Sequence, residues 1–449
     1  YYMDGDVQSF DVNVFDDCPS GSVDNCTHPY GWGTILVATM RFGGGEISID
    51  PNSDIDGDPS DDLTMRSAVL VFDVTDPEQP LVLLAEITHP ELGYTTSKPI
   101  VYKERVANSN GDIGGSVDKW YLSFGSGPAG TDAASKTAAI RNAVSNQNAR
   151  LFVYDLNDKS FVSGYAPRVL AETNSFVGDL SVMDWNNDYV DDAIYFGTVG
   201  GSVSSPTGKL MRFAPDGKLA PSLMLNGSNQ PYTAAPKPVL DRRGEAWVFA
   251  GTGRFFVSDD ILSSQQQSYH GVKEDTLSYS TIEKINLVDT TDIVIFEDGS
   301  ATEPDTVSDA KVASPSKLVD ETASTYGQVR GIVSNSPHGW FIDLGNTAAR
   351  NLLSATLIRD ILLFDEYTPS GNTCSPAGSS RLFNLNMLSG TPSSDIVFAT
   401  DSNITNAASS IKVLGGIDMG AGQIIGISAH RDTAIVGMGG GSGSGGFRM

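Results

Sequence analysis

The sequence LSVMDWNNDYVDDAIYFGT, residues 180–198, places a polar loop between two short apolar segments. Residues 180–183 and 193–198 are rich in aliphatic, aromatic and β-branched side chains, which favour strands. The residues between them are mostly Asp and Asn, which favour turns. The stretch therefore predicts a β-hairpin with a long acidic loop, and it indicates an all-β fold if the same pattern recurs along the chain.

Oxygen-bearing side chains follow one another at alternate positions of this loop. Asp184, Asn186 and Asp188 take positions 1, 3 and 5, the backbone carbonyl of Val190 takes position 7, and Asp192 takes position 9. Ca²⁺ prefers six to eight oxygen ligands at about 2.3–2.6 Å. Carboxylates this close would repel one another without a cation. The spacing predicts a calcium site with these five ligands; the alternative is an acidic surface hairpin that holds no ion.

The same loop departs from the calcium loop of a helix–loop–helix hand. Position 12 is Tyr195, where an EF-hand has a bidentate Glu, so an EF-hand is rejected. Position 6 is Tyr189, where Gly is usual because the chain turns sharply there. A calcium-binding hairpin loop is therefore expected, and Tyr189 is the one residue that argues against it.

A second acidic run covers residues 54–62. Asp54, Asp56, Asp58, Ser60 and Asp62 show the same alternation, but position 6 is a proline, which cannot adopt a positive φ. A solvated loop is the favoured interpretation of this run, and a second bound ion is the alternative.

Short β-rich runs recur through most of the chain, separated by Gly, Asp, Asn, Pro and Ser. They include residues 34–39, 68–74, 119–124, 150–156, 193–197, 209–213, 247–251, 361–364 and 381–385. One type of run ends in a polar turn and another ends in glycine, which is the pattern of a four-stranded propeller blade. At about 50–60 residues per blade, a quinoprotein-like β-propeller of about seven or eight irregular blades is expected. The rival architecture is a pair of tandem β-sandwiches.

The domain organisation follows from composition. Residues 1–436 show no internal boundary and are expected to form a single β-propeller domain, whereas the Gly/Ser-rich residues 437–449 predict a flexible tail. An alanine-rich insertion predicts a helix over residues 133–145, and a shorter helix is expected around residues 258–264.

Charge and motif content exclude several classes of function. The chain carries 55 acidic and 29 basic residues, a formal net charge of −26, which argues against nucleic-acid binding. It lacks an apolar run of about 18 residues, so no membrane-spanning helix is expected. Five scattered histidines and the absence of nucleophile-elbow and P-loop motifs predict no catalytic or organic-cofactor residues, and hence no enzyme. A glycosidase would need two carboxylates, which any chain this acidic supplies without specificity.

The three cysteines do not fix the compartment. Cys18 and Cys26 flank a turn-rich segment that can close as a small disulfide loop or remain as two free thiols, and Cys374 is left over. An extracellular location favours the bridge.

Several segments, in order along the chain, resemble the C-terminal propeller of the PilY/PilC family of type IV pilus tip adhesins and biogenesis factors. They are residues 4–7, 32–45, 66–77, 92–99, 120–127, 184–192, 208–213, 251–256, 267–272, 339–344 and 367–374. The family's calcium loop is matched at Asp184, Asn186, Asp188 and Asp192, and Tyr189 is the departure.

The resemblance implies a secreted protein that passes through the periplasm to the cell surface or the pilus tip. Its expected partners are pilins or minor pilins and a host or abiotic surface, and calcium would act as a switch in pilus assembly and retraction. The chain opens within an apparent strand and lacks the family's large N-terminal region, so a fragment or processed product is expected. Two alternatives stay open: a quinoprotein dehydrogenase, although no two cysteines are adjacent, and a purely structural filament subunit.

Overall fold

The computed structural model describes residues 2–16, 18, 26–49, 63–106, 117–163, 167–215, 219–302, 324–371, 378–395, 398–430, 433–439 and 445–448. The acidic run at residues 54–62 and Cys374 lie outside them. The chain divides into two compact units: Tyr1–Val203 with Met211–Ser222, and Ser204–Leu210 with Leu223–Met449.

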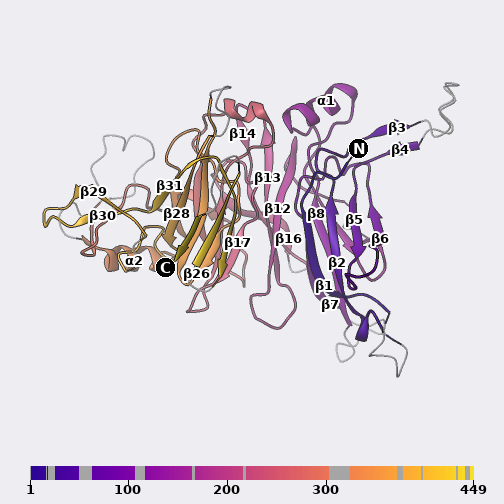
Figure 1. The fold of residues 1–449 in the computed structure, drawn as a ribbon, viewed down its shortest axis with the longest axis horizontal. Helices are drawn as coiled ribbons and strands as arrows, with labels where there is room; N and C mark the ends of the chain where they lie inside the picture. The colour runs from indigo at the N-terminus through magenta and orange to yellow at the C-terminus, as the bar shows by residue number, and fades with distance from the viewer. Residues whose placement is uncertain are drawn as a thin grey trace. The chain divides into compact units, whose positions relative to one another are not determined.

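The first unit is built from antiparallel sheets whose strands follow one another in chain order. The first sheet has the order β1 (Val7–Asn13), β2 (Trp32–Thr39), β5 (Val69–Asp73) and β6 (Val82–Ile87) (Figure 1). The second contains β7 (Ile100–Val106), β8 (Val117–Gly125), β9 (Arg150–Asp155) and β10 (Ser160–Phe161), with β11 (Arg168–Val169) also beside β9. A third sheet contains β12 (Ser175–Met183), β13 (Ala193–Gly201), β15 (Leu210–Ala214) and β16 (Leu219–Asn226), of which Leu210 and the residues after Ser222 are counted with the second unit. This succession is the strand arrangement that the repeated runs predict.

The first unit also has smaller elements. β3 (Ile47–Ile49) and β4 (Leu63–Met65) form a two-stranded sheet, whereas β14 (Pro206–Thr207) is counted with the second unit. The predicted helical insertion is confirmed as α1 (Ala133–Asn142), whose first turn is capped by the Asp132 carboxylate, which accepts hydrogen bonds from the Ala134 and Ser135 amides at 3.0 Å. A short 3₁₀ helix spans Pro29–Gly31.

The core of the first unit lies between its first two sheets. Apolar residues that alternate along β2, β5, β8 and β9 are buried there together, among them Ile35, Val37, Val71, Leu122 and Phe152. Cys18 and Cys26 form a disulfide, so the bridged state of this pair is confirmed.

The second unit has two further four-stranded antiparallel arrangements. One contains β17 (Lys237–Leu240), β18 (Ala246–Gly251), β19 (Ser268–Glu274) and β25 (Gly339–Asp343), with β21 (Val288–Asp289) parallel to β25. The other contains β26 (Thr356–Ile358), β27 (Ile361–Thr368), β28 (Ser379–Asn386) and β31 (Gly416–Ala421). Their facing aromatic residues, including Trp247, Tyr269, Trp340 and Phe364, form the main core of this unit.

Short strands and one helix accompany these sheets. They are β20 (Ile282–Glu283), β22 (Val294–Ile295), β23 (Ser300–Thr302), β24 (Ser324–Thr325), β29 (Thr400–Thr405), β30 (Ile411–Val413) and α2 (Tyr326–Asn335). The short helix expected near residue 258 is a 3₁₀ helix over Ser258–Leu262, and another covers Lys284–Asn286. Among the described residues, no helix is both long enough and apolar enough to cross a membrane.

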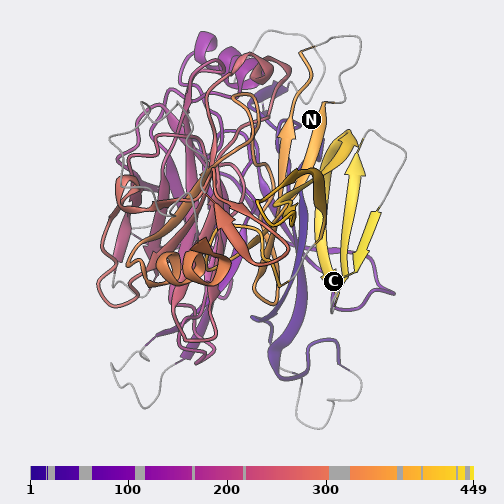
Figure 2. The ribbon, with the colours of Figure 1, turned by 90° about the vertical axis from the view of Figure 1, so that its left-hand side faces the viewer.

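The described residues near the C-terminus include three further strands. β32 (Gln423–His430), β33 (Thr433–Gly439) and β34 (Gly445–Arg448) form one antiparallel sheet, coloured yellow in Figure 2. The glycines serve close packing here, because a Cβ at Gly439 would come within 2.8 Å of the Ile425 side chain. The division into one domain over residues 1–436 and a tail over 437–449 stays a prediction, as does the blade count.

Candidate calcium site

The acidic loop is held by the β12–β13 hairpin of the first unit. Met183 lies opposite Ala193 in the antiparallel register, and the Asp192 amide donates to the Met183 carbonyl at 2.9 Å. Residues 184–192 therefore project from a rigid strand pair, as the sequence predicts. A hairpin end of this kind fixes both ends of a loop and leaves its polar side chains at the surface.

Three of the predicted ligands turn inward on the loop's own backbone. The carboxylate of Asp184 accepts from the amides of Asp188 at 3.3 Å and Tyr189 at 2.8 Å, and the Asn186 side-chain oxygen also accepts from the Asp188 amide at 2.8 Å. The Asp184 and Asn186 oxygens therefore converge on one backbone amide. Asp188 in turn accepts from the Val190 amide at 2.9 Å.

The last predicted side-chain ligand returns to the start of the loop. The Asp192 carboxylate accepts from the Trp185 amide at 2.8 Å, which joins the exit of the loop to its entry. The structure thus connects Asp184, Asn186, Asp188 and Asp192 through backbone amides of a single loop. Val190, predicted to contribute its carbonyl, belongs to the same network through its amide.

Tyr189 adopts the conformation that its position demands. Its φ is 67°, in the left-handed region, and Asn187 two residues earlier has a φ of 57°. A left-handed conformation costs a non-glycine residue about 1–2 kcal/mol, less for Asn. The Tyr189 side chain is 83% exposed, so no clash opposes the turn. The sharp turn therefore forms without glycine, and Tyr189 carries the strain.

Trp185 anchors the loop to the hairpin beneath it. Its side chain is buried, its ring meets that of Tyr195 edge-on with centroids 6.0 Å apart, and its Nε1 donates to the Tyr195 hydroxyl at 3.1 Å. Tyr195 is fully buried in this contact, consistent with the rejection of an EF-hand.

Asp191 has a structural function that the sequence did not reveal. Its amide donates to the Lys103 carbonyl at 3.0 Å and its carboxylate accepts from the Lys103 amide at 2.8 Å, so it pins the loop to β7. Burial raises the pKa of the Asp191 carboxyl above its ordinary value.

The donor chemistry of the loop fits a hard cation, since every predicted ligand is an oxygen. Neither Asp184 nor Asp188 forms an ion pair with a Lys or Arg side chain within the described residues. Over the same part of the chain there is no group of three or more His, Cys, Asp or Glu side chains poised to hold a metal. The set of five ligands, which includes an amide and a carbonyl, stays a prediction.

Comparison with known sequences gives one informative relative. The chain is 26% identical over 283 residues to the type IV pilus biogenesis factor PilY1 homolog of Xylella fastidiosa. The match covers 61% of this chain and spans only 17% of that protein's length. No model of a protein family matches the chain.

A solved structure gives the fold. The C-terminal domain of Pseudomonas aeruginosa PilY1 superposes with a TM-score of 0.54 at 19% identity, over 93% of this chain and 80% of that one. The chain therefore has the β-propeller fold of that domain, and the sequence-based resemblance to the C-terminal propeller of the PilY/PilC family is confirmed.

Proposed function

We propose that this chain, a relative in sequence and fold of PilY1 C-terminal domains, is a calcium-binding, non-enzymatic component of a type IV pilus. It supports assembly of the pilus against retraction and contributes to surface adhesion at the cell surface or pilus tip. The observation that carries the proposal is the oxygen-rich loop 184–192 within a propeller that resembles PilY1.

Calcium provides what the loop itself lacks. Asp184, Asp188 and Asp192 bring three carboxylates into one short loop, in a chain with a net charge of −26, and this favours uptake of a cation. Bound Ca²⁺ would be held by the side-chain oxygens of Asp184, Asn186, Asp188 and Asp192 and by the Val190 carbonyl. It would supply positive charge and close the loop, while Asp191 and Trp185 hold the loop to its sheet.

The order of the loop would then depend on cation concentration. A site of micromolar affinity stays filled at the millimolar calcium found outside cells. A surface formed by this loop would be complete outside the cell and incomplete where calcium is scarce, which is how a switch between assembly and retraction would operate.

Calorimetry tests calcium binding directly. We expect at least one site in the intact chain and no binding in the double variant Asp188→Ala/Asp192→Ala. Asp118→Asn is the matched control, because Asp118 lies in the same unit and has its own cationic partners, Lys103 and Arg105. Undiminished binding in the double variant would refute the ligand assignment.

Co-purification tests the pilus role. We expect the chain to be retained by pilins or minor pilins in calcium and released by chelator, and the double variant to be retained poorly in both conditions. Equal retention of both proteins in both conditions would separate pilus association from calcium and refute the switch.

A further inference from the structure

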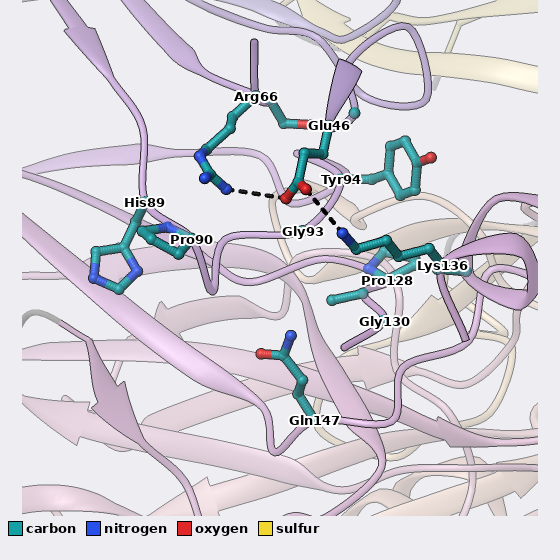
Figure 3. Close-up of a pocket in the computed structure, with 14 residues that line it drawn as sticks. Glu46, Arg66, His89, Pro90, Gly93, Tyr94, Pro128, Gly130, Lys136 and Gln147 are labelled. Carbon is teal, nitrogen blue, oxygen red and sulfur yellow. Dashed lines mark hydrogen bonds and ion pairs between the residues drawn. The ribbon is translucent and has the colours of Figure 1, made fainter. Parts of the chain in front are cut away.

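A cavity of about 110 Å³ lies in the first unit, well away in sequence from loop 184–192. It is bounded by the base of the β3–β4 hairpin, by α1, and by the segments around Tyr94 and Pro128 (Figure 3). A cavity needs only about 10–15 Å³ of such volume to hold one water, so this one has room for several waters or for one small ligand.

The rim carries a carboxylate fixed between two cations. One oxygen of Glu46 accepts from Arg66 at 3.0 Å and the other accepts from Lys136 at 2.9 Å, as the dashed lines in Figure 3 show. The hydrogen bond from Lys136 holds the pKa of Glu46 below its usual range, so this carboxylate stays ionised. Each oxygen keeps a lone pair, and two neighbouring carboxylate oxygens match the spacing of two adjacent hydroxyl groups.

Two of the residues that line the cavity have a buried polar atom without a partner. Ser67 is 4% exposed and its hydroxyl makes no hydrogen bond, and the buried side-chain oxygen of Gln147 also accepts none. In Figure 3, the Gln147 amide points into the cavity from the side opposite Glu46. A buried polar group without a partner is destabilising, so both groups would gain if a rotation of the side chain turned them toward a ligand that supplies hydroxyls.

The walls are apolar and partly aromatic. Tyr94 lines the cavity with Pro90 and Pro128, and its ring packs against Phe42 with centroids 5.4 Å apart. Burial raises the pKa of Tyr94, so its hydroxyl stays protonated, and burial lowers the pKa of the neighbouring His89, which favours a neutral imidazole. A pocket with apolar walls and a few convergent polar groups is the usual form of a small-molecule site.

We propose that this pocket binds one neutral pyranose unit of a glycan. Glu46 would accept from two adjacent sugar hydroxyls, Ser67 and Gln147 would pair with hydroxyls inside, and Tyr94 with the prolines would pack against the ring's C–H face. A neutral ligand is favoured over an acidic one, because Glu46 already occupies both cations and the chain's net charge of −26 repels anions.

This inference goes beyond the proposed function, because none of the lining residues belongs to loop 184–192. The pocket would supply a chemical basis for surface adhesion. Measuring sugar binding with and without chelator keeps the two proposals apart: binding that persists in chelator supports the pocket whatever the outcome of the calcium experiments.

The first test replaces the orphan hydroxyl. Saturation-transfer NMR and calorimetry on the intact chain would use methyl glycosides of glucose, galactose and mannose, with a Kd on the order of 1 mM expected for at least one. Ser67→Ala should weaken that affinity severalfold while leaving the melting temperature equal or higher, because an unsatisfied group is removed. Ser181→Ala removes another orphan hydroxyl, outside the pocket, and should leave the affinity unchanged.

The second test replaces the rim carboxylate. Glu46→Gln should weaken affinity about tenfold. Asp118→Asn, which alters a carboxylate equally bridged by two cations outside the pocket, should have no effect. Affinity should not change with pH above neutrality, because Glu46 stays ionised and the His89 imidazole stays neutral there, and it should fall only in acid solution. No detectable binding of any of the three glycosides, equal effects of pocket and control variants, or tighter binding of galacturonate would overturn the proposal.

Discussion

Loop 184–192 and the Glu46 rim handle negative charge in opposite ways within the same unit. At the rim, Arg66 and Lys136 each donate to the Glu46 carboxylate, so the chain supplies its own cations. In the loop, Asp184 and Asp188 accept from backbone amides, and no Lys or Arg of the described part of the chain pairs with them. This difference supports our two proposals, that the loop carboxylates bind an external cation and that the Glu46 carboxylate binds a neutral ligand.

Removal of calcium should cause the largest change in stability. At a calcium concentration about a hundredfold above Kd, binding to the folded state adds about 2.7 kcal/mol to the free energy of unfolding. Chelator should therefore lower the melting temperature of the parent chain, measured by thermal scans, and should leave Asp188→Ala/Asp192→Ala unmoved. Glu46→Gln should retain the full calcium response. If the melting temperature of Glu46→Gln did not respond to calcium, Glu46 would contribute to calcium binding and the two regions would not be distinct.

Asp191→Ala should cause the second-largest change in the free energy of unfolding. The substitution leaves the half-buried Lys103 amide without its side-chain acceptor, and the free energy of unfolding should fall by about 1–3 kcal/mol with or without calcium. Urea denaturation in both conditions measures this. If the loss appeared only in calcium, Asp191 would be a ligand rather than the residue that fixes the loop to β7.

Tyr189→Gly tests whether backbone strain at this position limits the stability and calcium affinity of loop 184–192. Glycine adopts the observed φ of 67° without strain. In calcium, the free energy of unfolding should therefore rise by about 1 kcal/mol, and the ion should bind severalfold more tightly. Asn187→Gly is the matched control and should gain less, because Asn tolerates the left-handed region. Weaker calcium binding in Tyr189→Gly would mean that the tyrosine side chain supports the site.

Glu46→Gln should have the smallest effect on stability. Its two ion pairs are exposed, with 42% of the side chain accessible, and such pairs contribute less than about 1 kcal/mol. Urea denaturation should show a change no larger than that of Asp118→Asn, whose carboxylate is similarly exposed. A much larger loss would assign Glu46 to the fold rather than to a ligand.

Local patterns predicted much of this molecule. Strand runs such as 34–39 and 247–251 lie within β2 and β18, and the alanine-rich helix begins at Ala133 as expected. These predictions succeed because alternation, β-branching and capping act over a few residues. The pairing of Asp191 with Lys103 was not predictable, since the two residues are 88 positions apart.

The sequence by itself determined the hairpin, the alternating oxygens of Asp184, Asn186, Asp188 and Asp192, and an all-β fold, because each depends on neighbouring residues. Only the tertiary structure shows that Tyr189 adopts the left-handed conformation and that Asp191 hydrogen-bonds to Lys103 in β7. It also brought Glu46, Ser67 and Gln147 around one cavity from separate elements. The physical reason is that burial and long-range pairing are set by packing between distant segments, which no local pattern records.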